Sequence, residues 1–204
     1  MRPLFPKLQY IQIKALRMKI LSLLVVGFAA LTLSANAQVP VGPGSLKLGK
    51  VEISAPSTPE YQITGGQNKR YKLGKWIEIE IKFETIPEEI DELTFKFTAL
   101  IEGKLLDGEV TYVNINKGNE HYAVMYISPK AIEKLTQGKA LTPASIGNVW
   151  VDVSKSGQVL GKEAYKNSAQ PNVPHVTGML RAKNETPFAP LYYDRYEEIK
   201  ASAR

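Results

Sequence analysis

Ile77-Glu78-Ile79-Glu80-Ile81-Lys82-Phe83 is the stretch of sequence that decides the fold. Apolar and charged side chains alternate through it without a break, and a period of two places all the apolar ones on one face of a β-strand. An amphipathic helix would need a repeat of about 3.6 residues. We therefore expect a strand that is buried on one face and faces solvent on the other.

The same alternation recurs on both sides of this strand. Further strands are expected at residues 46–53, 93–101, 110–115, 122–127, 149–153, 159–160 and 176–181. Glycine stands in candidate reversals with a positive φ at Glu102-Gly103, Asp107-Gly108, Lys117-Gly118 and Ser156-Gly157. Several short strands joined by such turns are typical of a β-sandwich.

One short helix interrupts the strands. Ser128 is a suitable N-cap, Pro129 suits the first helical position, and Gly138 can end the helix. A short helix between strands fits a crossover from one sheet to the other. The predicted fold class is therefore all-β: an immunoglobulin-like antiparallel β-sandwich with one short helix at a crossover and an extended, aromatic C-terminal segment.

Residues 1–37 have the organisation of a secretory signal peptide. Arg17 and Lys19 precede an uncharged apolar run at 20–33, and Ala35-Asn36-Ala37 follows as a small-x-small cleavage site. The run is shorter than the roughly 20 residues that span a bilayer, so we expect cleavage after Ala37 and no permanent membrane anchor. Met18 is an alternative start, which would make residues 1–17 an over-extended reading of the gene. The expected location is the periplasm or the outer cell surface of a Gram-negative-type bacterium.

Composition sets the domain organisation and excludes some partners. Residues 38–45 form a flexible leader rich in Pro and Gly, 46–182 the sandwich, and 183–204 an aromatic, Pro-rich C-terminal segment. The formal charge is +6, but residues 1–37 hold five basic and no acidic residues, which leaves +1 on the remainder. This balance argues against nucleic acid as a partner, because such binding needs a clustered basic surface. The chain has no cysteine, which excludes disulfides, thiolate zinc ligands and thiol catalysis.

No arrangement in the sequence marks a catalytic or metal site. The histidines, His121 and His175, are far apart and have no partner at metal-binding spacing, so we expect surface or cross-strand roles. The acidic stretch at 84–92 offers oxygen ligands for Ca²⁺ but lacks the Asp-x-Asp-x-Asp-Gly spacing. The nucleophile elbow, the zinc-protease motif and the phosphate-binding glycine loops are absent. We expect a protein that is not an enzyme and holds no metal or cofactor.

The C-terminal segment is the most unusual part of the sequence. Residues 186–196 concentrate Phe, Tyr and Pro, and we expect residues 197–200 to finish a short helix. Its aromatic side chains either cover an open edge of the domain's own sandwich or dock onto another subunit or partner, since Tyr and Arg are favoured at interface centres. The residues predicted to bind a partner are Phe188, Tyr192, Tyr193 and Tyr196.

Three segments together resemble a known group of proteins. The signal at 18–37, the strand at 77–83 and the ending Thr-Pro-Phe-Ala-Pro-Leu-Tyr-Tyr-Asp-Arg-Tyr at 186–196 are similar to exported immunoglobulin-like proteins of verrucomicrobial bacteria that are encoded beside type IV pilus-like genes. The resemblance implies a structural or adhesive role at the cell envelope and carries over no catalytic residue. True pilins keep their apolar N-terminal helix, whereas cleavage after Ala37 removes it here.

Three functions remain open from the sequence. The first, which we expect, is a non-catalytic binding or assembly module linked to a type IV pilus-like or adhesion system, with other envelope or pilus-apparatus proteins or a second copy as partner. The second is a small secreted carbohydrate-binding domain or glycan-acting enzyme, in which Trp76 or Trp150 stacks on sugars. The third is a structural subunit without a ligand. Both tryptophans lie in predicted strands, where packing in the core or on a sheet face is usual.

Overall fold

The computed structural model describes residues 45–62, 64–65, 73–86, 88–166 and 168–201. The predicted signal peptide, its cleavage site and residues 38–44 of the predicted leader lie outside these residues. None of the helices in the described part of the chain is long and apolar enough to cross a membrane.

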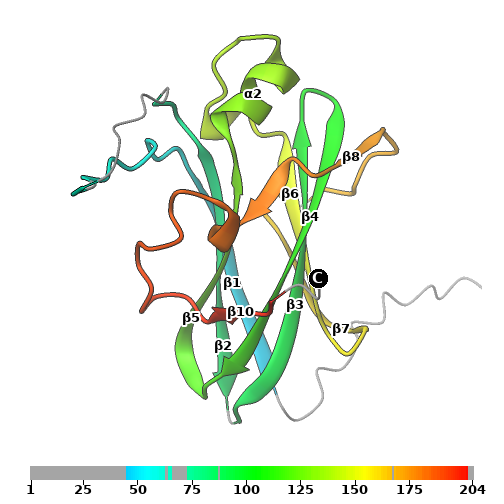
Figure 1. Cartoon of the computed structure of the whole chain (residues 1–204). Helices are drawn as coiled ribbons and strands as arrows, with labels where there is room; N and C mark the ends of the chain where they lie inside the picture. Colours follow the sequence, from blue (N-terminus) through cyan, green and yellow to red (C-terminus); the bar gives the residue numbers. More distant parts are fainter. Residues whose placement is uncertain (1–44, 63, 66–72, 87, 167, 202–204) are drawn as a thin grey trace, which may run out of the picture. The chain divides into compact units, whose positions relative to one another are not determined.

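Two β-sheets face each other as a sandwich (Figure 1). The four-stranded sheet has the order β1 (Ser45–Ser54), β2 (Ile77–Ile86), β5 (Gly118–Ile127) and β9 (Leu180–Ala182). The six-stranded sheet has the order β10 (Glu198–Ile199), β4 (Lys104–Ile115), β3 (Ile90–Ile101), β6 (Asn148–Lys155) and β7 (Gln158–Ala164), and β8 (His175–Thr177) also pairs with β4. The predicted immunoglobulin-like sandwich is confirmed.

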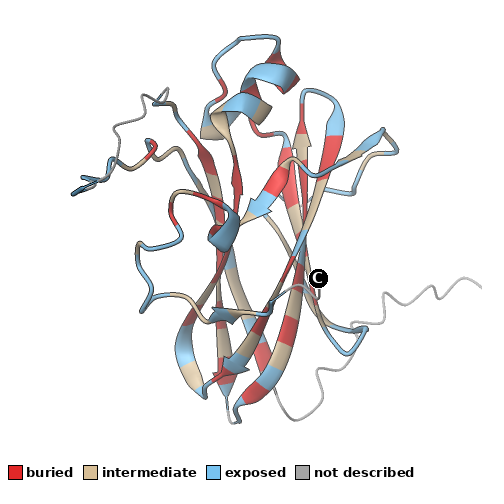
Figure 2. Cartoon of the chain, viewed as in Figure 1, coloured by how far each residue is buried: buried red, intermediate tan, exposed pale blue. Residues whose placement is uncertain are grey.

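The core lies between the inner faces of the two sheets, as the alternation in the sequence predicts (Figure 2). Ile79 and Phe83 in β2 are fully buried, and so is Phe97 in β3. The Phe83 ring lies 4.9 Å from the ring of Phe95 across the sandwich, measured between centroids. Contacts between aromatic rings from opposite sheets fill the space that the twist of the sheets leaves between them.

The single described α-helix, α2 (Pro129–Thr136), connects β5 of one sheet with β6 of the other. The Ser128 hydroxyl accepts the Ala131 N–H at 3.2 Å, and the helix ends where Gln137 and Gly138 have positive φ angles of 54° and 88°. The predicted N-cap, first residue and crossover are thus confirmed. A 3₁₀ turn, η1 (Pro143–Ser145), completes the connection.

The turn predicted at Asp107-Gly108 is wrong. The Glu102-Gly103 and Ser156-Gly157 reversals have the expected positive φ angles, but Asp107-Gly108 lies inside β4. A Cβ at Gly108 would lie 2.5 Å from the Leu180 Cβ, so glycine is needed there because β9 packs closely against β4. Gly118 is not a positive-φ turn residue either: it begins β5, where a Cβ would lie 2.6 Å from the His121 Nε2.

The end of the chain departs from the prediction in two places. Residues 176–181, predicted as one strand, instead belong to two short strands, β8 and β9, in different sheets, with Gly178 at φ +75° between them. β8 pairs with β4 in parallel, an exception to the predicted antiparallel pairing. Residues 197–200 do not form the predicted helix, because Glu198–Ile199 pairs as β10 with Tyr112 and Val113 at the outer edge of β4.

Candidate functional site

Residues 183–200, which we call the C-terminal strap, cross the outer face of the four-stranded sheet and then reach the edge of the six-stranded one (Figure 1). The strap starts with a 3₁₀ turn, η2 (Lys183–Glu185), directly after β9. The Thr186 hydroxyl donates to the Lys183 carbonyl at 2.7 Å and accepts the Phe188 N–H at 3.2 Å. These local bonds turn the chain back over the sheet.

Phe188 anchors the strap in an aromatic cluster. Its ring stacks on Tyr126 of β5, with centroids 4.7 Å apart and planes 8° from parallel, and meets Trp76 edge-on at 5.6 Å. Phe188 is 4% exposed, and Val124 and Tyr126 beneath it are fully buried. Each aromatic pair of this kind adds about 0.5–1.5 kcal/mol beyond the burial of the rings, so the cluster fixes the strap firmly.

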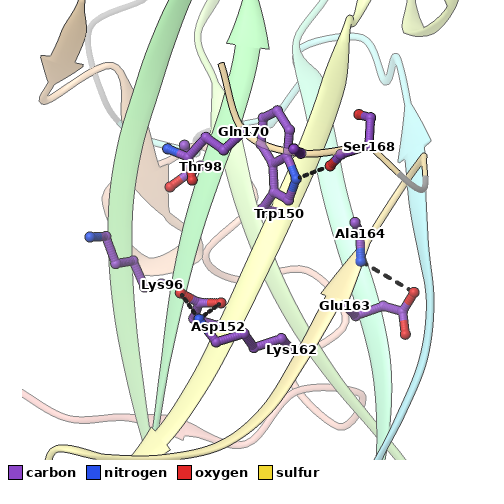
Figure 3. Close-up of a pocket in the computed structure, with 10 residues that line it drawn as sticks. Lys96, Thr98, Trp150, Asp152, Lys162, Glu163, Ala164, Ser168 and Gln170 are labelled. Atoms are coloured by element: carbon purple, nitrogen blue, oxygen red, sulfur yellow. Dashed lines mark hydrogen bonds and ion pairs between the residues drawn. The ribbon is translucent and has the colours of Figure 1, made fainter. Parts of the chain in front are cut away.

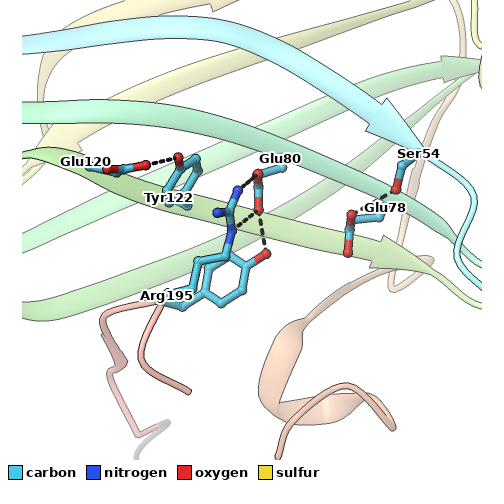
Figure 4. Close-up of polar contacts among 7 residues, drawn as sticks. Ser54, Glu78, Glu80, Glu120, Tyr122 and Arg195 are labelled. Carbon is cyan, nitrogen blue, oxygen red and sulfur yellow. Dashed lines mark hydrogen bonds and ion pairs between the residues drawn. The ribbon is translucent and has the colours of Figure 1, made fainter. Parts of the chain in front are cut away.

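Glu80 binds the strap from the outer face of β2 (Figure 4). The Arg195 guanidinium donates to both Glu80 carboxylate oxygens, at 2.6 and 3.3 Å, and its central carbon lies 3.5 Å from the centre of the Tyr122 ring. The Tyr196 hydroxyl donates to the same carboxylate. The hydrogen bonds that Arg195 donates to Glu80 raise the pKa of Arg195, and burial followed by the Glu80 contact raises the pKa of Tyr196. Both groups therefore keep their protons across the physiological range.

Further polar contacts fix the end of the strap. Glu197 lies 2.6 Å from Nδ1 of the largely buried His121, and the Asn114 amide donates to Glu198 at 3.1 Å. Lys200 pairs with Glu92 at the start of β3. Because these partners come from β5 of one sheet and from β3 and β4 of the other, the strap joins the two sheets.

Lys183 is an unusual buried cation at the start of the strap. Lys183 is 5% exposed. Its Nζ donates to the Ala189 carbonyl at 2.9 Å and lies 5.3 Å from the centre of the Tyr196 ring. Loss of water around the ammonium group lowers its pKa. The lysine closes the turn at 183–189 from inside, which is a structural role.

The four residues predicted to bind a partner occupy two different environments. Phe188 and Tyr196 belong to the aromatic cluster and to the Glu80 contact, so the domain itself already holds their side chains. Tyr192 and Tyr193 stand on the outer turn of the strap, 59% and 82% exposed. The Arg195 N–H donates to the Tyr192 carbonyl at 3.1 Å, and Tyr192 has a φ of +53°, uncommon for a tyrosine. The strap thus presents this tyrosine pair in a fixed turn, and a partner role for it stays a prediction.

The residues that hold the strap were missed in the sequence, although a signal for them was present. Tyr122, Val124 and Tyr126 alternate on the outward face of β5, where a strand exposed on one side would carry polar residues. An apolar outward face indicates a second cover, and the aromatic C-terminal segment is the part of the chain rich enough to supply it. Nothing in the sequence marks Glu80 and Arg195 as partners, because a single charged residue at an exposed position is ordinary.

A hollow lies on the outer face of the six-stranded sheet (Figure 3). Its volume is about 640 Å³, and its floor carries Trp150 and Asp152 of β6, with Lys96 and Thr98 of β3 on one side. Trp150 is partly exposed, whereas Trp76 is 7% exposed under Phe188. The two tryptophans, which the sequence does not distinguish, thus lie in different surroundings: Trp76 is buried and Trp150 is partly exposed.

The titratable groups of the described residues do not gather into a catalytic or metal-binding set. No group of three or more His, Asp or Glu side chains there is placed to hold a metal ion. His121 is a buried cross-strand residue that also contacts the Thr85 hydroxyl at 3.0 Å, and His175 lies 2.5 Å from Asp107. Two members of the acidic stretch, Glu84 and Glu92, form ion pairs with lysines.

Comparison with known proteins gives a family and a structural relative. A protein-family model matches residues 37–203. The crystal structure of a protein from Akkermansia muciniphila, a verrucomicrobium, is similar to this chain, with a TM-score of 0.67 and 25% sequence identity over 79% of this chain and 95% of that chain. No curated protein matches the sequence. The resemblance to a verrucomicrobial protein is supported in this coarser form, while the link to pilus genes stays a prediction.

Proposed function

We propose that this chain, which belongs to the family whose model spans residues 37–203, is a non-catalytic envelope protein that binds or assembles with other proteins. In this proposal it is exported through the signal at residues 1–37 and works in the periplasm or on the outer surface. Its partners are components of a type IV pilus-like or adhesion system, with a second copy of the chain as the alternative. Similarity to an A. muciniphila protein over most of both chains supports the verrucomicrobial setting.

The exposed pair Tyr192 and Tyr193 is the observation that carries the proposal. Most other large apolar side chains of the described residues pack inside the sandwich or beneath the strap, yet these two rings project from it. Their turn is held in place by the contact between Arg195 and Glu80, so little ordering is left for binding to require. Rigid, exposed tyrosines are favoured contacts at the centres of protein interfaces.

Photo-cross-linking in the native host tests this role. A benzoylphenylalanine placed at Tyr193 should give a discrete cross-linked species, whose mass distinguishes a second copy from a different envelope protein. The same residue at Tyr165, which is 38% exposed and lies beyond β7 on the other sheet, is the matched control and should give none. Absence of a cross-link at 193, or the same pattern at both positions, would rule out the tyrosine pair as the docking contact.

Export is tested separately. Intact-mass analysis of the protein from the native envelope should show a chain that begins at Gln38. A protein that still carries the apolar run at 20–33 would contradict cleavage and would indicate an anchored, pilin-like arrangement.

A further inference from the structure

We propose that the hollow on the outer face of the six-stranded sheet is a binding site for a neutral saccharide, with Trp150 as the platform on which a sugar ring stacks. The site goes beyond the assembly role proposed above, because it lies on the outer face of the six-stranded sheet, whereas the strap crosses the outer face of the four-stranded sheet. It is built from two cross-strand rows of side chains and a loop, which contribute different chemistry.

The hollow exists because the first row places small side chains on both sides of Trp150. Trp150 lies in register between Thr98 of β3 and Ala164 of β7. Both neighbours are small, so they leave space on either side of the indole, where large cross-strand partners would normally pack. A partly exposed aromatic ring flanked by short side chains offers an apolar surface of about the width of a sugar ring. The C–H groups on one face of a pyranose carry a slight positive charge and pack well on an aromatic face.

The loop after β7 holds this platform in place. The indole N–H donates to the Ser168 carbonyl at 2.9 Å. Asn148, 1% exposed, donates through its amide to the Lys166 carbonyl at 2.9 Å and to the Ser168 hydroxyl at 2.8 Å, and accepts the Lys166 N–H at 2.7 Å. A buried asparagine with all these bonds satisfied fixes Lys166 and Ser168 beside the platform. The hollow is thus pre-formed, which lowers the entropic cost of binding.

The second row supplies hydrogen bonds beside the platform (Figure 3). Asp152 lies in register between Lys96 and Lys162, and its carboxylate is 3.3 Å from the Lys162 Nζ. Glu163 and Gln170 also line the hollow. Sugar hydroxyls both donate and accept, so a row with one carboxylate acceptor between two ammonium donors suits them. With two lysines and two carboxylates the lining is balanced in charge, which favours a neutral ligand over an acidic one.

Size and composition separate this hollow from the other large one. A volume of about 640 Å³ falls within the range of about 300–1,000 Å³ that is usual for small-ligand sites, and would accept one or two sugar rings. The hollow beside α2 is larger, about 820 Å³, but its floor is formed by apolar residues such as Ile132 and Leu141 and carries no aromatic ring. The two features that sugars need together, an aromatic platform and a polar row, are combined at Trp150.

The test uses the whole mature chain and a panel of neutral trisaccharides built from galactose, glucose, mannose and N-acetylglucosamine. Saturation-transfer NMR with the unaltered protein should show contact with at least one of them. Titration of the Trp76→Phe variant, in which Trp150 is the only tryptophan, should then show a saturable change in fluorescence with the same sugar. Trp150→Ala should weaken binding at least about tenfold.

Two further variants make the result specific. Asp152→Asn should weaken binding severalfold, because it removes a carboxylate acceptor from the polar row, whereas Tyr193→Ala on the strap should leave it unchanged. Circular dichroism checks that each variant is folded. If no trisaccharide of the panel binds the unaltered protein, or if binding survives Trp150→Ala, the proposal is wrong. The cross-linking result at Tyr193 does not depend on this outcome, so the two proposals fail separately.

Discussion

The outer faces of the two sheets carry one tryptophan each, and the two residues have opposite surroundings. Trp76, directly before β2, lies beneath Phe188 and is 7% exposed, with its indole N–H donated to the Thr58 hydroxyl at 3.0 Å. Trp150, in the middle of β6, stays partly exposed beside Asp152 and Lys96. One face is covered by the chain's own C-terminal strap and the other is left open.

The difference comes from the outward positions of the central strands. On the four-stranded sheet, β5 turns Val124 and Tyr126 outward, and apolar side chains there need a cover. On the six-stranded sheet, β3 and β6 turn Lys96 and Asp152 outward, and these remain in water. The face opposite the core, and not the core face alone, therefore determines where an extra segment packs.

Removal of the strap should have the largest effect. Truncation after Lys183 uncovers Trp76, Val124 and Tyr126 and takes away the partner of the β4 edge. The loss should exceed that of Phe188→Ala alone, for which we expect about 3–5 kcal/mol, out of a total stability of about 5–15 kcal/mol. Thermal unfolding and solution mass measure it.

Truncation after Lys200 is the control, because it leaves every described contact of the strap and removes only the last four residues. If the longer truncation left stability unchanged but abolished association in solution, the strap would be a docking segment and not a cover.

Core and surface positions on one strand provide the next comparison. Phe97 in β3 is fully buried between the sheets, while its neighbour Lys96 points to the open outer face. Phe97→Ala should lower the free energy of unfolding by about 3–5 kcal/mol, and Lys96→Ala by about 0.5 kcal/mol or less. Chemical denaturation of both variants checks this. Equal losses would show that the phase of β3 is wrong.

The Glu80 contact should matter less. Glu80→Gln removes the charge that holds Arg195 and Tyr196, but Arg195 is partly exposed and water replaces part of the interaction. We expect a loss of about 1 kcal/mol. Glu52→Gln, opposite Glu80 in register on β1, is the matched control and should change stability less. The same loss in both variants would mean that the contact does not secure the strap.

The smallest effect on stability comes from the buried tyrosines and is seen at alkaline pH. Burial raises the pKa of Tyr112, Tyr126 and Tyr196 above the ordinary value near 10, with the Glu78 charge adding to the shift at Tyr126. The unfolded chain releases these protons near pH 10 while the folded chain keeps them, so stability is complete below that pH and falls above it. Tyr126→Phe removes one of these three groups and should therefore lessen the fall in Tm.

The fall in Tm of the two proteins is best compared above pH 10.5. Burial lowers the pKa of Lys183, so the folded chain releases this proton at a lower pH than the unfolded chain does. Its effect on stability is therefore opposite in sign: stability rises with pH, and this rise ends near the ordinary lysine pKa of 10.5. At neutral pH, Tyr126→Phe should cost little, because the Tyr126 hydroxyl has no hydrogen-bond partner among the described residues. An unaltered alkaline slope in this variant would show that Tyr126 is not shielded by the strap.

The strands could be predicted from the sequence because each buries one face, and that burial leaves a period of two. β2 follows this pattern along its length, β3 follows it from Leu93 to Phe97 and β6 from Val149 to Ser154, and α2 has its N-cap and proline in the expected places. The route of the strap could not be predicted, because β8, β9 and β10 have only two or three residues each and gain their order from the edges with which they pair. The pattern of Glu197 to Lys200 suits a helical turn, but the free edge of β4 determines its structure.

The candidate sites were anticipated only in part. The aromatic C-terminal residues were singled out, and the distinction between the buried Phe188 and the exposed Tyr193 needed the contact with Trp76 and Tyr126. For Trp150, the sequence could not show that its cross-strand neighbours are Thr98 and Ala164, because pairing between strands distant in sequence is a tertiary property.

Collisional quenching of the two tryptophans tests the central claim, that the chain covers one face of its sandwich and leaves the other open. Trp150→Phe leaves Trp76 as the only tryptophan, and Trp76→Phe leaves Trp150. We expect blue-shifted emission that acrylamide quenches weakly from Trp76, and red-shifted, readily quenched emission from Trp150. Equal quenching of the two would contradict the account, because it would mean that the strap does not cover the four-stranded sheet in solution.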